Sequence, residues 1–331
     1  MQNSELLAKK LVEKAVLLAD GATGTSLFEL GLESGDAPET WNITQSAKIR
    51  MHYQSFIEAG CDIILTNSFG GNSLRLNLHG LSDRAFELSR ISAEIGREII
   101  DKNNKEVILA GSVGPTGELI EPIGKLNYKN AVEVFHEQIE GLRAGGVDII
   151  WAETLSDPTE YTAVSEAASL ANIQWFGTMS FDTKGNTMMG FTPSNLVSLV
   201  DDLPLKPIGV GANCGVGPAD LIRTILDMKD SSLPLIAKAN AGIPEFIDGE
   251  IFYNGIPSLM AEYALLAKRA GAKIIGGCCG TSVAHIKAIN TALLTSTDDS
   301  PPSLKEIEAK LGSFSGSPGT RDRRKRNGRN R

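Results

Sequence analysis

The sequence has little of what membrane-spanning and exported proteins carry. None of its apolar runs approaches the length needed to cross a bilayer. Residues 1–18 alternate apolar and charged side chains, which predicts an amphipathic helix rather than a signal peptide. Hydrophobic residues make up 42% of the 331 residues and charged residues 22%, a composition able to form a large core. We therefore expect a globular, cytoplasmic protein.

Cysteine and histidine are both scarce, with four residues of each. In a reducing compartment, clustered thiols more often serve a metal or catalysis than disulfides. The histidines are His52, His79, His136 and His285. None follows a predicted strand, so we interpret them as surface or helix residues. This disfavours a zinc hydrolase with histidine ligands.

Excess positive charge is confined to one end of the chain. The net charge is −8, but residues 321–331 hold seven basic residues and one acidic residue, which leaves the preceding 320 residues at −14. Phosphate binding depends on clustered Lys and Arg, so nucleic acid is an unlikely partner for the acidic body. We predict one domain over residues 1–297 and a disordered linker and basic tail over residues 298–331. A nucleic-acid-binding or scaffold role through this tail is the non-enzyme alternative.

Eight short apolar or β-branched runs recur along the chain, and most are followed by a helical pattern. They begin at Val16, Ile63, Val107, Ile149, Trp175, Ile208, Leu235 and Lys273. Strands that are apolar on both faces and separated by helices predict a parallel sheet, and eight such units close a (β/α)8 TIM barrel. A doubly wound open sheet is the alternative.

Polar and reactive residues follow the predicted strands. They are Asp20, Thr66, Asn67, Ser112, Glu153, Ser180, Asn213, Cys214, Lys238, Asn240, Cys278 and Cys279. Active sites of TIM barrels form where the carboxyl ends of the strands meet, so this distribution favours the barrel.

Three of the four cysteines occupy such positions. Cys214 lies in Gly-Ala-Asn-Cys-Gly, and Cys278 and Cys279 lie in Gly-Gly-Cys-Cys-Gly. The flanking glycines relax the backbone enough for both adjacent sulfurs to face one ion. Three thiolates would bind Zn²⁺ and leave a fourth position open, as in catalytic zinc sites. The alternative is that they pack as small apolar residues, which is how we interpret Cys61.

A zinc ion with three thiolate ligands is a weak Lewis acid and suits a thiol ligand better than water. The bound thiol would lose its proton and remain nucleophilic, which points to attack on an activated alkyl group. Asp20 and Glu153 can act as acid and base or bind an ammonium group, and we favour binding because a thiolate needs no general base. Capping a turn (Asp20) and facing solvent (Glu153) are the structural alternatives.

Several motifs together resemble the zinc-dependent homocysteine S-methyltransferase family over roughly residues 14–293. They are Asp20-Gly-Ala-Thr-Gly-Thr25, Thr66-Asn-Ser-Phe69, Gly111-Ser-Val-Gly-Pro-Thr116, Glu153-Thr154, Gly211-Ala-Asn-Cys214, Asn240-Ala-Gly-Ile-Pro244 and Gly276-Gly-Cys-Cys-Gly280. The resemblance implies a TIM barrel in which Cys214, Cys278 and Cys279 hold zinc, with homocysteine sulfur as fourth ligand and methionine as product. It also implies that Asp20 and Glu153 bind the homocysteine ammonium, and Gly21 and Thr66 its carboxylate.

The methyl donor differs within this family: glycine betaine, S-methylmethionine, S-adenosylmethionine or, in multidomain methionine synthases, methylcobalamin. We expect no room in this chain for folate and cobalamin modules. The whole sequence, including residues 35–41 and 180–190, is most similar to bacterial betaine-homocysteine methyltransferases, so we expect betaine. The indole of Trp41 is a natural wall for a quaternary ammonium, assisted by Phe69, although ordinary packing is the alternative for both.

The chain departs from the animal betaine enzymes at two positions. Those enzymes carry a tyrosine after the residue matching Phe69 and another after the residue matching Glu153, where this sequence has Gly70 and Thr154. Two aromatic donor contacts are therefore missing. The betaine site must be built differently, or the donor is another onium compound or a corrinoid protein.

Overall fold

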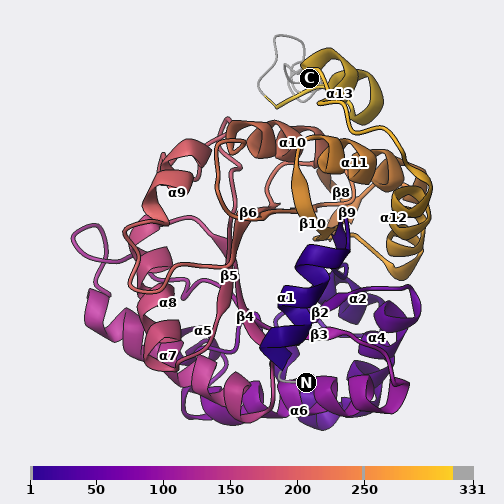
Figure 1. The fold of residues 1–331 in the computed structure, drawn as a ribbon. Helices are drawn as coiled ribbons and strands as arrows, with labels where there is room; N and C mark the ends of the chain where they lie inside the picture. The colour runs from indigo at the N-terminus through magenta and orange to yellow at the C-terminus, as the bar shows by residue number, and fades with distance from the viewer. Residues whose placement is uncertain (1–2, 248–249, 316–331) are drawn as a thin grey trace, which may run out of the picture.

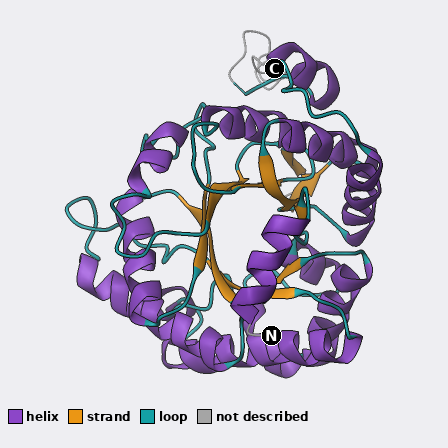
Figure 2. Ribbon diagram, viewed as in Figure 1, coloured by secondary structure: helices purple, strands orange, loops and turns teal. Residues whose placement is uncertain are grey.

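The computed structural model describes residues 3–247 and 250–315. A ring of eight parallel strands lies inside a layer of helices (Figure 2). The strands are β1 (Leu17–Leu18), β2 (Ile63–Leu65), β3 (Ile108–Val113), β4 (Ile149–Leu155), β5 (Trp175–Met179), β6 (Gly209–Cys214), β7 (Leu235–Ala239) and β10 (Ala272–Gly277). They pair in the order β1-β10-β7-β6-β5-β4-β3-β2, and a parallel bridge between Ala19 and Ile63 joins the two ends. The eight predicted strands and the TIM barrel are confirmed, and the open sheet is excluded.

Helices alternate with these strands, as Figure 1 shows. The main ones are α2 (Thr23–Glu29), α4 (Ser46–Glu58), α6 (Ala85–Asn103), α7 (Tyr128–Ala144), α8 (Pro158–Leu170), α9 (Pro193–Leu199), α10 (Pro218–Asp227), α11 (Pro257–Arg269) and α12 (Val283–Thr295), with short α3 (Trp41–Thr44) and α5 (Ser73–Asn77) and 3-10 turns η1 (Pro38–Thr40) and η2 (Ser82–Arg84). Proline opens α10 and α11, where its missing N–H costs nothing. No helix in the described part of the chain has the length and apolar composition of a membrane span.

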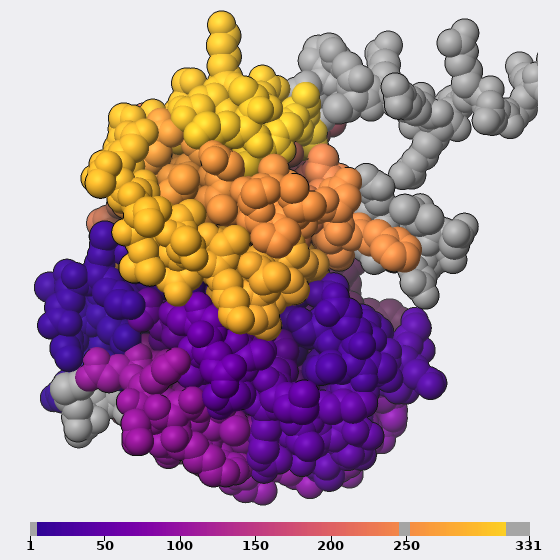
Figure 3. All heavy atoms as spheres, turned by 90° about the vertical axis from the view of Figure 1, so that its right-hand side faces the viewer, coloured from indigo at the N-terminus to yellow at the C-terminus, as the bar shows by residue number. Residues whose placement is uncertain are grey.

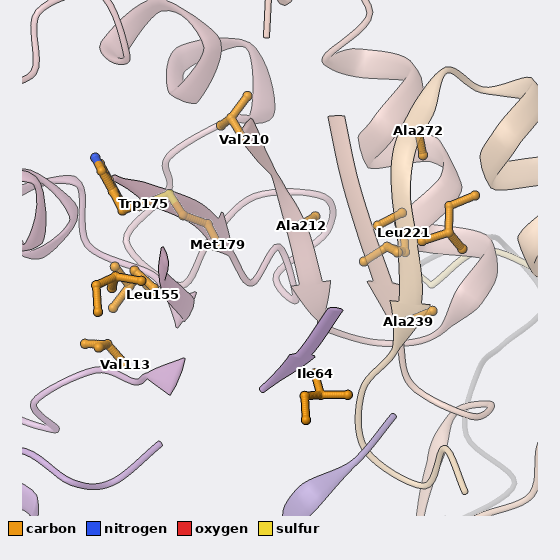
Figure 4. Packing of buried hydrophobic residues seen from close by; sticks show 14 of the residues in the cluster. Ile64, Val113, Leu155, Trp175, Met179, Val210, Ala212, Leu221, Ala239 and Ala272 are labelled. Carbon is orange, nitrogen blue, oxygen red and sulfur yellow. The ribbon is translucent and has the colours of Figure 1, made fainter. Parts of the chain in front are cut away.

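Alternate residues of each strand belong to two different buried clusters. Ile63 and Ile236 lie in a cluster inside the ring, whereas their neighbours Ile64 and Ala237 lie in a larger cluster between the strands and the helices. Figure 4 shows part of this outer cluster, including Ile64 and Leu221. Because side chains alternate with a period of two, residues that continue the inward series past the apolar layer face the open end of the barrel.

The amino-terminal end of the barrel is covered by α1 (Asn3–Glu13), the amphipathic helix predicted over residues 1–18. It lies across the ring in Figure 1. Leu7 is buried in the inner cluster, and the ammonium groups of Lys10 and Lys14 lie 3.0 and 2.6 Å from the buried carboxylate of Asp62. The cavity lies at the opposite end of the barrel, where the carboxyl ends of the strands meet.

Part of the segment that we predict as linker is ordered, because α13 (Leu304–Leu311) packs on the barrel. Ile307, Leu311 and Phe314 are buried against α10 and α11, and Ser315 donates two hydrogen bonds to Asp220. In Figure 3 the yellow C-terminal residues cover the orange helices. Burial of the apolar side chains stabilises this short helix on the barrel, although Gly, Ser and Pro residues surround it in the sequence. The predicted disorder of residues 316–331, and with it the basic segment, lies outside the described residues.

Replacing Ile307 by Ala should lower the free energy of unfolding by about 2–4 kcal/mol, because its side chain is fully buried. Chemical denaturation measures this directly. Lys305→Ala, at an exposed position of the same helix, is the control and should change stability little. Equal stabilities of the two variants would show that α13 does not pack on the barrel in solution.

Candidate functional site

Three cysteine side chains converge at the carboxyl end of the barrel. The Sγ atoms of Cys214, Cys278 and Cys279 all lie within 4.8 Å of one another. A tetrahedral zinc site with Zn–S bonds of about 2.3 Å places its sulfurs about 3.8 Å apart, so small side-chain rotations suffice to bring all three onto one ion. The three thiols therefore fit a thiophilic divalent metal.

Backbone geometry unusual for non-glycine residues makes this convergence possible. Cys214 ends β6 with a φ of +60°, in the left-handed region, and Gly215 follows at +71°. At Gly277 a Cβ atom would lie 2.1 Å from the side chain of Thr281. Only glycine fits there, so the chain can turn tightly into Cys278 and Cys279.

Without a cation the three thiols cannot all ionise. Hydrogen bonds from Cys214 and Cys278 lower the pKa of Cys279 to about 3, whereas hydrogen bonds to the other two sulfurs raise the pKa of Cys214. The side-chain amide of Asn213 lies 3.7 Å from Cys278 Sγ. A bound divalent cation would replace the remaining thiol protons and stabilise the full thiolate set.

Glu153, on β4, continues the inward-facing series and lines the cavity. Ser112 Oγ donates a hydrogen bond of 2.5 Å to Glu153 Oε1. Burial raises the pKa of this carboxyl to about 7, against the opposing effect of the Lys238 charge. The cavity wall therefore holds a carboxylate that a cationic ligand would stabilise.

Lys238 and Asp20 form a buried ion pair beside Glu153. Lys238 Nζ lies 2.9 Å from Asp20 Oδ1, and the Leu65 N–H donates to Asp20 Oδ2 at 2.7 Å. Burial lowers the pKa of Lys238, but the negative charges of Asp20 and Glu153 outweigh it and raise that pKa above its usual value. Lys238 lines the cavity and Asp20 lies behind it. The expected binding residues do not include Lys238, although a lysine within the apolar run of β7 indicates a functional interior.

Gly21 and Thr66, which we expected to bind a carboxylate, both line the cavity. A Cβ atom at Gly21 would lie 2.2 Å from the Thr281 carbonyl oxygen, so no other residue fits. Thr66 Oγ1 accepts a hydrogen bond of 3.0 Å from the Ser112 N–H and lies 2.6 Å from Ser68 Oγ. The Thr66 hydroxyl therefore also links the end of β2 to β3 through this hydrogen bond.

The cavity has a volume of about 400 Å³, a size typical of small-molecule sites. Phe69 lines it, as does Gly70. Trp41 does not: it is buried in the outer cluster, and Lys48 Nζ lies 4.5 Å from the centre of its ring. The expected indole wall is thus replaced by core packing.

The histidines lie on helices or at the surface, as expected, and one of them also lines the cavity. His52 on α4 is buried, and burial lowers its pKa to about 4. His136 lies on α7, and His285 caps α12. His79 follows α5 and lines the cavity, which its position outside the strands did not reveal.

Thr154 occupies one of the two positions where an aromatic contact was missing. Its φ is +63°, its N–H donates to Asn213 Oδ1, and its Oγ1 accepts from Asn213 Nδ2, both at 2.7 Å. Thr154 therefore holds the residue before Cys214 in place. Its side chain orients the sulfur cluster in addition to lining the cavity.

A hairpin of β8 (Pro244–Ile247) and β9 (Glu250–Tyr253) also reaches the site. A Cβ atom at Gly280 would lie 2.3 Å from Tyr253 Cβ, and a hydrogen bond from Tyr253 contributes to the low pKa of Cys279. We had not predicted this hairpin, because its short strands follow the Asn240-Ala-Gly-Ile-Pro turn signals and lie outside the barrel repeat.

Replacing Glu153 by Gln should raise the melting temperature near pH 8. The pKa of Glu153 is raised from 4.5 to about 7 in the folded protein. Ionisation of Glu153 therefore destabilises the folded protein increasingly between about pH 4.5 and pH 7. Above pH 7 the loss of stability is constant, at most about 3 kcal/mol. The gain should vanish near pH 4.5. Melting curves across this range, with exposed Glu29→Gln as control, measure it. A loss of stability that is equal at every pH would contradict the assignment.

Comparisons with known proteins identify the family and the fold. Methionine synthases of Mycobacterium tuberculosis and Mycobacterium leprae are each 28% identical over 86% and 87% of this chain, which spans a quarter of their length. The homocysteine methyltransferase MmuM of Escherichia coli, in its metallated form, has the same fold, with a TM-score of 0.73 and 22% identity over 86% of this chain and 99% of that one. The family model for homocysteine S-methyltransferases matches residues 17–293, so the chain belongs to the homocysteine S-methyltransferase family.

Proposed function

We propose that this protein transfers a methyl group from glycine betaine to homocysteine, giving dimethylglycine and methionine. The observation that carries the proposal is the convergence of three thiols on one point of a cavity whose wall holds a buried carboxylate, in a member of this family. The reduced thiols are in keeping with a cytoplasmic location.

Zinc is the metal we propose for Cys214, Cys278 and Cys279, because three soft thiolates within 4.8 Å of one another suit it. When bound, zinc would lower the pKa of the homocysteine thiol and keep its sulfur as a nucleophilic thiolate. Asn213 and Thr154 orient the cluster from one side, and Tyr253 does so from the other.

Homocysteine would bind with its ammonium group on Glu153 and its carboxylate near Gly21 and Thr66. Asp20 acts on the ammonium through Lys238 rather than by direct contact: it neutralises Lys238, so the charge of Glu153 remains available for the ligand. The Glu153 carboxyl, with its pKa near 7, would ionise fully beside a cation.

The transfer is a single displacement. The sulfur lone pair forms a bond to a betaine methyl carbon as the C–N bond breaks, and the C–N electron pair stays on nitrogen, leaving neutral tertiary dimethylglycine amine. No general base is needed, since a thiol bound to zinc would release its proton to solvent before the transfer. Alignment of the two substrates in one cavity can contribute about 7–11 kcal/mol to catalysis.

Replacing Cys214 by Ala should abolish both stoichiometric zinc and methyl transfer, because two thiolates do not complete the ligand set. Metal analysis and a methionine assay on the same preparation measure the two effects. Cys61→Ala, a buried thiol outside the cavity, is the matched control and should keep its zinc. A Cys214→Ala protein with full zinc and normal turnover would remove Cys214 from the site.

A panel of donors separates betaine from its alternatives. Wild-type protein with zinc and homocysteine should form methionine with glycine betaine, because this donor is small enough for the cavity of about 400 Å³ beside the thiols. S-methylmethionine, S-adenosylmethionine and a methylated corrinoid are the comparison donors. Formation of methionine with one of these and none with betaine would reject the proposed donor.

A further inference from the structure

The loops after β1 and β2 bring charged residues into the cavity that the homocysteine site does not use. Glu39 lies in η1, Gly70 follows β2, and Arg75 lies on α5. All three line the same cavity as Cys214 and Glu153. A second substrate bound in this cavity therefore has these residues within the same lining as the sulfur cluster.

Glu39 is a buried carboxylate that forms no ion pair with another described residue. Its side chain is almost fully buried, and Oε1 accepts a hydrogen bond of 2.7 Å from the Gly70 N–H. Burial raises the pKa of Glu39, and it is opposed by backbone hydrogen bonds and by the charges of Arg75 and His79, neither of which forms an ion pair with it. A buried carboxylate that is held only by backbone hydrogen bonds, here from Glu39 and Gly70, is costly unless a cation joins it.

Because Gly70 has no side chain, there is space for the Glu39 carboxylate beside it. A Cβ atom at position 70 would lie only 3.1 Å from Glu39 Oε1, so a larger side chain would press on the carboxylate. A larger side chain at position 70, such as the aromatic ring of the animal betaine enzymes, would therefore require the Glu39 carboxylate to shift. Here the Glu39 carboxyl group occupies the space beside position 70.

Arg75 supplies the complementary charge. Its guanidinium group lies close enough to Gly117 that a Cβ atom there would be 3.2 Å from Arg75 Nη1. It is half-buried and forms no ion pair within the described part of the chain. A guanidinium at a cavity wall suits a ligand carboxylate.

We propose that Glu39 binds the cationic centre of the methyl donor and Arg75 binds the donor carboxylate, so that the cavity selects small onium zwitterions. This inference rests on the proposed methyl transfer and adds the residues that recognise the donor. Gly70 determines the specificity by leaving room for the Glu39 carboxylate.

Two variants of the full-length, zinc-loaded protein test the two contacts separately. Glu39→Gln keeps the acceptor oxygen for the Gly70 N–H and removes only the charge; Arg75→Gln removes the guanidinium. The probes are glycine betaine and 3,3-dimethylbutanoate, which has the same shape and carboxylate but no positive charge. Glu39→Gln should raise the KM for betaine about tenfold or more and leave inhibition by 3,3-dimethylbutanoate unchanged. Arg75→Gln should weaken both ligands.

The homocysteine KM and the zinc content should stay at wild-type values in both variants, which shows that they are folded. Exposed Glu33→Gln, a charge removed from the same loop but outside the cavity, is the matched control and should behave as wild type. An unchanged betaine KM in Glu39→Gln, or an equal loss for both probes, would overturn the inference while leaving the methyl transfer intact.

Failure of the proposed donor gives a different result. If the wild type uses S-methylmethionine and not betaine, the betaine proposal fails, and a raised KM for S-methylmethionine in Glu39→Gln would still support the inference. Activity with a methylated corrinoid alone would reject both.

Discussion

A closed barrel forces every second residue of each strand to face inward, and the site depends on this constraint. The inward series is apolar where α1 covers the ring, with Ile63, Ile236 and Ile274. Farther along the strands the same series reaches Glu153 and Lys238. The packing that stabilises the barrel therefore also aims charged groups into its open end.

Burying these charges is possible because they compensate one another. Lys238 would be costly alone inside the ring, but Asp20 contacts it directly and Glu153 adds a second negative charge. The three groups carry a net charge of −1 when all are ionised, which suits a cationic amino group. The ion pair of Lys238 and Asp20 thus compensates its own charges, whereas the charge of Glu153 is left for a ligand.

The fold could be predicted from the sequence because apolar runs and helix boundaries are local signals. The series of residues after the strands likewise located Glu153 and the three cysteines in one cavity. Trp41 could not be placed this way, since whether an indole faces a cavity or the core depends on contacts such as Lys48 that are made in three dimensions. Glu39 was missed for a similar reason: it lies in a loop, and only the space left by Gly70 shows where its carboxylate goes.

The junction between β1 and β2 closes the ring with little backbone pairing, a single bridge between Ala19 and Ile63. Two aspartates reinforce it: Asp62 accepts from the Leu18 N–H at one end, and Asp20 accepts from the Leu65 N–H at the other. Asp20 is thus a fastener of the ring as well as a member of the charge network. A substitution at this position changes the closure of the barrel and the electrostatics of the cavity together, and amide exchange at Leu65 would report the first effect while ligand affinity reports the second.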